Sequence, residues 1–267
     1  MSLHPVDLES CLARPSAPER FLPKLLGRRP TPVILDVGAC AGDDTIRYFR
    51  LFPRARLFAF EPLPANQEII RANFSKYGVT AELVPIALSN HSGPSVFHVS
   101  SGTPPELFSG EDWNYGNKSS SLLAPAAEPM HGWIGFPDRI TVTCETLDAF
   151  CKARGLGRLD FVHMDVQGAE GLVLEGAKAT LSHIRVLWLE VSNQELYRGQ
   201  KLRAEIEDLM RRARFKLVHE ESRGVEGDQL YVNLRFPRNC AWFFLRRAES
   251  ILSLLMRSVG LRRPPYA

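Results

Sequence analysis

The chain has 267 residues, of which 45% are hydrophobic and 24% charged, so it can bury the core of one catalytic-size domain. Its formal net charge of +3 is too small to indicate a nucleic-acid-binding protein, and no apolar run approaches the roughly 18 residues that span a membrane. The five cysteines are scattered without a C-x-x-C pair or metal-ligand spacing, and the N-terminus lacks a signal-peptide pattern, which together favour a cytoplasmic protein.

Residues 1–30 contain five prolines, which limit any helix there to a short segment. Phe21, Leu22, Leu25 and Leu26 have the spacing of a short amphipathic helix. We therefore expect an N-terminal helical extension that covers an edge of the sheet and contributes packing, not chemistry.

Residues 31–45 change from a buried strand to a glycine loop and then to a helix start. Residues 33–37 are apolar except for Asp36, which is typical of a strand covered on both faces. Gly38 and Gly42 allow a sharp turn, and ligands of open α/β sheets bind at such turns. Three side chains at the helix start can accept hydrogen bonds from its first amides, namely Asp43, Asp44 and Thr45.

Strand and helix patterns alternate after this turn. Helices are predicted at 46–52 and 62–77, and strands at 56–60 and 81–88, which gives the β-α-β-α-β order of a parallel, doubly wound sheet. The strand at 56–60 delivers Glu61 to its carboxyl end.

Residues 91–140 interrupt this order with six glycines, six prolines and eight serines. We expect mostly loop, with one hairpin strand at 95–99. The segment also carries Trp113, Tyr115 and Trp133, and long aromatic-containing loops in compact domains are usually functional. We interpret it as a substrate-covering insertion, the alternative being a lid that only protects the core.

Regular patterns return after residue 140. Strands are expected at 140–144, 160–166, 186–191, 216–219 and 230–234, and helices at 147–153, 171–181 and 201–215. His163 and Asp165 alternate along one strand, and Glu190 lies at the same edge on the next, so three polar side chains should converge on one crevice. The alternative for His163 is a hydrogen-bonded structural histidine.

The C-terminal segment 235–267 is basic and predicted to be an amphipathic helix. Residues 235–263 hold seven arginines and one glutamate, a local excess of +6 that leaves about −3 for the rest of the chain. Such helices more often pack on their own domain or on a second copy than on a membrane. We therefore expect that this helix can contact a second copy of the chain in a homo-oligomer and does not associate with a membrane.

The spacing of Gly38 and Glu61, 23 residues apart, is typical of a nucleoside-binding α/β half in which the acid accepts from the ribose hydroxyls. A dinucleotide site needs glycine where this chain has Cys40, and no Gly-Lys-Ser or Gly-Lys-Thr follows, so neither a pyrophosphate site nor a P-loop is indicated. A nucleoside without phosphates suits the loop better, and S-adenosylmethionine is the common one.

Several motifs in this order resemble the FkbM-type family of S-adenosylmethionine-dependent methyltransferases. They are Leu-Asp-Val-Gly-Ala-x-x-Gly at 35–42, Phe-Glu-Pro at 60–62, Ala-Leu-Ser at 87–89, Ser-Ser-Ser-Leu at 119–122, Thr-Leu-Asp at 146–148, Met-Asp-Val-Gln-Gly-Ala-Glu at 164–170 and Leu-Glu-Val at 189–191. The resemblance covers residues 31–234.

The resemblance implies a class I, Rossmann-like methyltransferase fold: an α/β, doubly wound, mostly parallel seven-stranded sheet with the last strand antiparallel. It implies that Asp36, Gly38 and Gly42 border the methionine part of the cofactor, Glu61 the ribose and Ala87 the adenine. The full set of candidate cofactor-binding residues is Asp36, Gly38, Ala39, Gly42, Thr45, Glu61, Ala87 and Asp165. The implied activity is O-methylation of a hydroxyl on a small molecule, sugar or natural product.

The candidate catalytic residues are His163, Asp165 and Glu190. Methyl transfer from a sulfonium needs an aligned acceptor oxygen and a base for its proton, and His163 or Asp165 is suited to that role. A rival mechanism has Asp165 and Glu190 bind Mg²⁺, but two carboxylates without a third ligand make a weak metal site. The family usually has Lys and Glu where this chain has His163 and Gln167, so the base or the substrate is expected to differ.

Two other functional classes stay open at this point. One is an NAD-dependent oxidoreductase that uses the same fold half, which Cys40 disfavours. The other is a methyltransferase-like binding module without activity. The acceptor itself cannot be read from the insertion.

Overall fold

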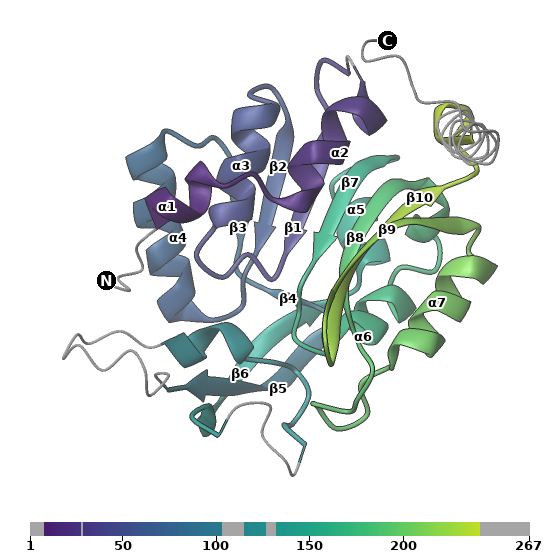
Figure 1. The fold of residues 1–267 in the computed structure, drawn as a ribbon. Helices are drawn as coiled ribbons and strands as arrows, with labels where there is room; N and C mark the ends of the chain where they lie inside the picture. Colours follow the sequence, from purple (N-terminus) through teal and green to yellow (C-terminus); the bar gives the residue numbers. More distant parts are fainter. Residues whose placement is uncertain (1–7, 28, 103–114, 127–131, 241–267) are drawn as a thin grey trace, which may run out of the picture.

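The structure is a computed structural model that describes residues 8–27, 29–102, 115–126 and 132–240. Its centre is a seven-stranded sheet in the order β3-β2-β1-β7-β8-β10-β9 (Figure 1). The strands are β1 (Val33–Val37), β2 (Arg56–Phe60), β3 (Glu82–Val84), β7 (Leu159–Met164), β8 (Ile184–Ser192), β9 (Phe215–Arg223) and β10 (Glu226–Asn233). Only β10 runs antiparallel to its neighbours β8 and β9 among these strands, which confirms the predicted sheet.

One face of the sheet packs against three helices of the second half of the chain. These are α5 (Leu147–Ala153), α6 (Glu170–Glu175) and α7 (Arg203–Arg212). Leu147, Val173 and Ile206 from these helices join Leu35 and Val162 from the strands in one apolar core. Full burial of each such side chain stabilises the fold by about 1.5–3 kcal/mol.

The opposite face packs against helices of the first half, α2 (Ala17–Leu26), α3 (Asp43–Leu51) and α4 (Pro64–Tyr77) (Figure 1). Leu22 of α2 and Tyr48 of α3 share a core with Phe161 of β7. Ile70 of α4 packs with Ile46 of α3. The sheet is therefore covered on both faces, as its apolar central strands require.

The N-terminal segment contains α1 (Leu8–Ala13) and α2. Contrary to our expectation, α2 covers the face of the central strands and not an edge. Arg185 on β8 is buried there, and its guanidinium donates hydrogen bonds to the carbonyl oxygens of Leu25 and Leu26 at the end of α2. This buried contact fixes the end of α2 beside the amino end of β8, which starts at Ile184.

The single strand predicted at 81–88 is divided. β3 ends at Val84, where Pro85 has no amide to continue the ladder. β4 (Ala87–Leu88) then pairs in parallel with β6 (Gly135–Glu145), which pairs antiparallel with β5 (Gly93–Ser101). The strands at either end of the 91–140 segment are thus longer than predicted and form a second, three-stranded sheet.

Two further segments differ from the prediction or lie beyond the description. The helix expected at 171–181 ends at Glu175. The following Gly176 must be glycine, because a Cβ there would lie 2.0 Å from the carbonyl oxygen of Ser89. A 3-10 turn, η3 (Thr180–His183), replaces the end of the expected helix. Residues 241–267 of the predicted basic segment and Trp113 lie outside the described residues. No described helix is long and apolar enough to cross a membrane.

Candidate functional site

The turn between β1 and α3 brings three strand ends together. The amide of Gly38 donates to the carbonyl oxygen of Phe60 at 3.0 Å. Gly38 has a φ of +89°, and a Cβ there would lie 1.8 Å from the carbonyl oxygen of Asp165. Glycine is therefore required both by the backbone conformation and by the close approach of the chain after β7.

Glu61 is buried at the carboxyl end of β2, beside this turn. One carboxylate oxygen accepts from the amide of Cys40 at 2.9 Å, and the other accepts from the amide of Leu63 at 2.8 Å. Burial raises the pKa of Glu61 to about 7, although these amides oppose the shift. Because each carboxylate oxygen can accept more than one hydrogen bond, Glu61 is oriented and can still accept from a ligand.

A pocket opens next to Glu61. Its apolar wall comes from the small sheet and the segment after η2 (Tyr115–Ser119), with Ala87, Phe97 and Leu122. Its polar end holds Asn66, whose Oδ1 accepts from Asn117 Nδ2 at 2.9 Å. We call this the nucleoside pocket, because it joins a flat apolar space to an oriented carboxylate.

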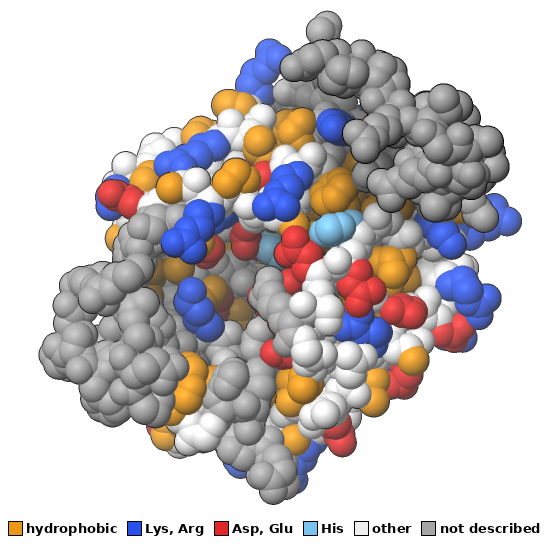
Figure 2. All heavy atoms as spheres, viewed as in Figure 1, with side chains coloured by type: hydrophobic (Ala, Val, Ile, Leu, Met, Phe, Trp, Pro, Cys, Tyr) orange, Lys and Arg blue, Asp and Glu red, His pale blue; other side chains and the backbone are white. Residues whose placement is uncertain are grey.

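Two further cavities share lining residues with the nucleoside pocket. The central cavity shares Gly38, Cys40, Lys118, Asp165 and Gln167 with it. The N-terminal cavity shares Asp44, His163 and Asp165 with the central cavity and reaches the start of α2. Figure 2 shows charged side chains of both signs around the hollow on this face. Asp165 lines all three spaces and is their common point.

Asp36 and His163 are register partners on β1 and β7, so their side chains project from the same face of the sheet. Asp36 is buried and accepts a hydrogen bond from the hydroxyl of Thr45. Burial raises its pKa to about 7, whereas His163 acts to lower it. Asp36 is therefore partly protonated near neutral pH.

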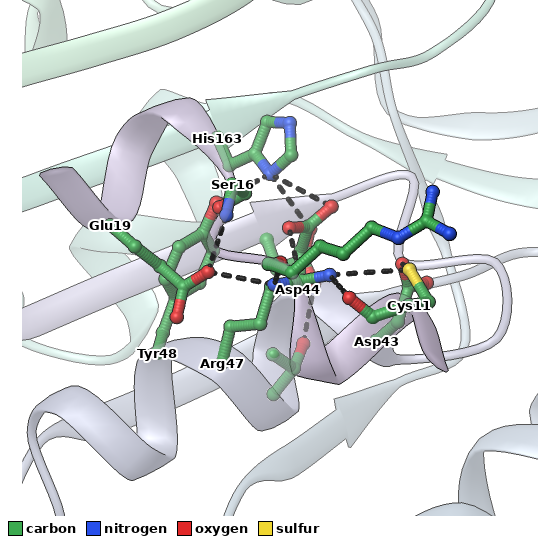
Figure 3. A network of polar contacts seen from close by, with 11 residues as sticks. Cys11, Ser16, Glu19, Asp43, Asp44, Arg47, Tyr48 and His163 are labelled. Carbon is green, nitrogen blue, oxygen red and sulfur yellow. Dashed lines mark hydrogen bonds and ion pairs between the residues drawn. The ribbon is translucent and has the colours of Figure 1, made fainter. Parts of the chain in front are cut away.

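His163 is held from one side by a polar network (Figure 3). Its Nδ1 lies 2.8 Å from the Tyr48 hydroxyl, 3.7 Å from Asp44 Oδ2 and 3.8 Å from Asp36 Oδ1. Burial and the neighbouring Asp43 raise the pKa of Asp44 well above its usual range. His163 also lines the central and N-terminal cavities, so a ring tied at Nδ1 is presented to both spaces.

Gln167 connects Asp165 to Glu190. Its Nε2 donates to Asp165 Oδ1 at 2.7 Å and to Glu190 Oε2 at 3.2 Å, while its Oε1 accepts from the Tyr197 hydroxyl at 3.1 Å. Gln167 has a φ of +55°, and its carbonyl oxygen accepts from the Ser121 hydroxyl at 2.7 Å. A strained residue held by this many partners has a fixed orientation.

Asp165, Glu170 and Glu190 form the one possible metal-binding group among the described residues, with ligand atoms within 4.8 Å of one another. Glu170 supplies the third carboxylate that the sequence did not suggest, although its Oε1 already accepts from the amide of Val166 at 2.9 Å. Burial raises the pKa of Glu170 to about 8, and burial together with Asp165 raises that of Glu190. Glu170 is thus largely protonated near neutral pH.

The structure brings most of the predicted site residues together, and they line different cavities. Glu61 and Ala87 line the nucleoside pocket, Asp36, Ala39 and His163 the central cavity, and Gly38 and Asp165 both. Thr45 does not cap α3 as expected, because its hydroxyl donates to Asp36. Gly42, with a φ of +79°, stands at the start of α3, where a Cβ would lie 2.8 Å from Phe74. Glu190 is linked to Asp165 through the side chain of Gln167.

Sequence reasoning missed three residues of the site, Lys118, Asn66 and Tyr48. Desolvation lowers the pKa of Lys118, but nearby negative charges, among them the carboxylates of Asp43 and Asp165, outweigh this effect and hold the pKa above its ordinary value. The only local indication of Lys118 was the Ser-Ser-Ser-Leu motif that follows it at 119–122. Tyr48 could be identified only through its contact with His163, 115 residues away.

Comparisons with known proteins show the family of the chain. The family model described as the methyltransferase FkbM domain matches residues 36–217. The chain is 38% identical over 208 residues to the 2-O-methyltransferase NoeI of Sinorhizobium fredii (strain NBRC 101917 / NGR234), covering 78% of this chain and 82% of that protein. It is 28% identical over 225 residues to the AMB antimetabolite synthetase AmbE of Pseudomonas aeruginosa, where the match covers 76% of this chain and 10% of that protein.

Among solved structures, the methyltransferase FkbM from Methylobacillus flagellatus KT aligns with a TM-score of 0.46 at 14% identity, covering 76% of this chain and 44% of that one. The N-terminal domain of EvdMO1 with SAH bound aligns with a TM-score of 0.43 at 13% identity, covering 85% and 80% of the two chains.

Proposed function

The chain belongs to the FkbM methyltransferase family and is an S-adenosylmethionine-dependent O-methyltransferase, and we propose that it methylates a hydroxyl of a small molecule, a sugar or a natural product, with His163 as the base. The observation that carries this proposal is that Asp165 lines all three cavities. The nucleoside pocket meets there the two spaces that His163 lines. A donor and an acceptor can thus be held side by side.

The residues present fit the cofactor. Glu61 offers an oriented carboxylate to the ribose hydroxyls, and the wall that includes Ala87 and Phe97 suits the adenine ring. Gly38 leaves the backbone open toward the central cavity, where Asp36 and Asp165 suit the positively charged methionine part. S-adenosylmethionine supplies an electrophilic methyl group on its sulfonium.

Cys40 separates this site from a dinucleotide site. Its side chain lines both the nucleoside pocket and the central cavity, at the point where a pyrophosphate would approach the backbone. An NAD-dependent oxidoreductase is therefore disfavoured by the loop as well as by the family.

His163 is the group that we assign to proton removal. With the proton on Nδ1 directed at the Tyr48 oxygen, Nε2 would accept the proton of the acceptor hydroxyl while the hydroxyl oxygen bonds to the methyl carbon. The carbon–sulfur bond of the sulfonium would break in the same step and leave a neutral thioether. The nearest Asp36 oxygen lies 3.8 Å from Nδ1, and the positive charge then on the imidazole ring favours the ionised form of this carboxyl group. Asp165, which lines all three cavities, positions the reacting groups.

The proposal is tested by titrating the protein with S-adenosylmethionine and with NAD, and by assaying methyl transfer to a panel of hydroxylated sugars and natural products. We expect binding of S-adenosylmethionine alone and transfer to at least one acceptor oxygen. Binding of NAD instead would refute the assignment. Cofactor binding with no transfer to any hydroxyl would support the inactive binding module.

Glu61→Gln provides the matched variant, because it keeps the shape of the side chain and removes its charge. We expect S-adenosylmethionine to bind about 10-fold more weakly, since hydrogen bonds to a charged acceptor contribute about 1.5–3 kcal/mol. The exposed Glu68→Gln, on the first half of α4, is the control that should leave binding unchanged.

A further inference from the structure

The η2 turn places a cation at the junction of the nucleoside pocket and the central cavity. Lys118 lines both spaces, and the preceding Asn117 lines only the nucleoside pocket. Neither residue has a role in the mechanism above. Both belong to the 91–140 segment, which we expected to cover the acceptor.

The backbone around Lys118 is fixed from two directions. The amide of Ser119 donates to the Ser100 hydroxyl on β5 at 3.1 Å, and the carbonyl oxygen of Ser119 accepts from the Tyr197 hydroxyl at 2.8 Å. The Tyr197 hydroxyl also lies 3.1 Å from Gln167 Oε1, beside Asp165. The turn is therefore tied to the loop that carries the reaction centre, and Lys118 projects from a preorganised backbone.

The charges around the central cavity are unequal. Its described lining residues include five carboxyl groups, and Lys118 is the one lysine or arginine among them. The carboxyl groups are those of Asp36, Asp43, Asp44, Asp165 and Glu226. The methionine end of the cofactor carries a sulfonium, an ammonium and one carboxylate. The acids suit its two positive groups, whereas a carboxylate among them needs a cation.

We propose that Lys118 binds the carboxylate of the methionine part of S-adenosylmethionine, so that the 91–140 segment holds the cofactor as well as covering the acceptor. The proposal rests on the function proposed above. It assigns the two ends of the cofactor to different elements: Glu61 and Asn117 hold the nucleoside, and Lys118 holds the amino acid. The ammonium of lysine acts as a point charge on the carboxylate, within reach of both spaces.

The test compares two ligands that differ in the amino-acid end. S-adenosylhomocysteine carries the carboxylate, whereas 5′-methylthioadenosine keeps the nucleoside and thioether but has no amino acid. Both are titrated calorimetrically into the full-length wild-type protein and into Lys118→Met, Lys118→Arg and Asn117→Ala. Lys118→Met keeps most of the aliphatic length and removes the charge.

We expect Lys118→Met to weaken S-adenosylhomocysteine about 10- to 100-fold, the effect of losing a charge-assisted hydrogen bond, and to change 5′-methylthioadenosine less than about 2-fold. Lys118→Arg should recover part of the loss. Asn117→Ala is the matched control on the same turn, and it should weaken both ligands by similar factors. Its partner Asn66 lies in the nucleoside pocket.

Equal losses of both ligands in Lys118→Met, or no loss of S-adenosylhomocysteine, would overturn the assignment of Lys118. A wild-type protein that binds neither ligand would instead refute the proposed function. An unchanged S-adenosylhomocysteine affinity with a raised KM for the acceptor would place Lys118 on the acceptor and would also overturn the proposal.

Discussion

The Tyr48 hydroxyl lies 2.8 Å from Nδ1 of His163, at the inner end of a network that also contains Asp36 and Asp44. Tyr48 is fully buried, and burial raises its pKa well above the usual value. The hydroxyl therefore stays protonated and neutral across the working pH range. It is a fixed hydrogen-bond partner that decides which way the imidazole ring points and which nitrogen faces the cavities.

Tyr48→Phe removes this hydrogen bond and keeps the aromatic packing. We expect kcat to fall about 10-fold, because one hydrogen bond of about 1–1.5 kcal/mol orients the base. The pH profile of kcat should shift, whereas the affinity for S-adenosylhomocysteine should stay the same. A purely structural Tyr48 would lower the melting temperature without moving the pH profile.

His163→Ala removes the base itself. We expect turnover to fall about 10²- to 10⁴-fold, the usual contribution of general base catalysis, with the affinity for S-adenosylhomocysteine retained. Initial rates at saturating cofactor and acceptor give the comparison. If turnover is unchanged, the base is another group, and Asp165, which lines the same cavities, is the next to test.

Local patterns predicted most of the sheet. β1 and β7 are short apolar runs that end in polar residues and glycine turns, and this information lies within about ten residues of chain. The antiparallel last strand came from the family resemblance. The small sheet was only partly predicted, because Gly93 pairs with Cys144 across 51 positions and nothing local indicates that register.

The sequence predicted those site residues that lie at the ends of neighbouring strands. Asp36 and His163 meet because β1 and β7 are neighbours, and motif positions identified both. Lys118 and Tyr48 could not be identified in that way. Their roles depend on where a turn and a helix pack in space, and a lysine in a polar loop or a tyrosine on a helix carries no signal of its own.

Gly38 and Gly78 form a matched pair for a stability test. Both have positive φ, +89° and +65°, but a Cβ on Gly38 would meet the Asp165 carbonyl at 1.8 Å, whereas a Cβ on Gly78 meets nothing within 4 Å. Gly78→Ala should cost about 1–2 kcal/mol of unfolding free energy, from the backbone conformation alone. Gly38→Ala should cost more than about 4 kcal/mol, because the backbone must also move.

Urea unfolding measures both variants, and soluble yield is the readout if Gly38→Ala does not fold. Equal free energies of unfolding for the two variants would contradict the close approach of β1 and the chain after β7. Retained S-adenosylhomocysteine binding in Gly78→Ala shows that the control preserves the site.

Metal removal tests the three carboxylates of Asp165, Glu170 and Glu190. Each carboxylate already accepts a hydrogen bond from a neutral donor. The side-chain amide of Gln167 donates to Asp165 and Glu190, and the backbone amide of Val166 donates to Glu170. We therefore expect methyl transfer to change less than about 2-fold after EDTA treatment, unlike a reaction that uses a metal as Lewis acid. Activity lost in EDTA and restored by Mg²⁺ would contradict this expectation.

The buried acids predict how stability depends on pH. Folding raises the pKa values of Asp36 and Glu61 to about 7 and that of Glu170 to about 8, chiefly through burial. Between the unfolded and folded pKa values the folded protein holds more protons than the unfolded chain. Stability from these groups is fully present below about pH 4 and is lost as the pH rises through 7 to 8.

Glu170→Gln isolates one of these groups, because the amide oxygen can still accept from the Val166 amide. We expect the unfolding free energy of the variant to fall less steeply between pH 5 and 8, by up to about 1.4 kcal/mol per pH unit. Glu175→Gln on the same helix is the control, since the pKa of Glu175 is lowered by its hydrogen bond to Asn90 and by Lys201 despite partial burial. Its slope above pH 6 should equal that of the wild type. Urea unfolding at fixed ionic strength gives the unfolding free energy of all three proteins at each pH. Equal slopes against pH for Glu170→Gln and the wild type would show that Glu170 is ionised in the folded state.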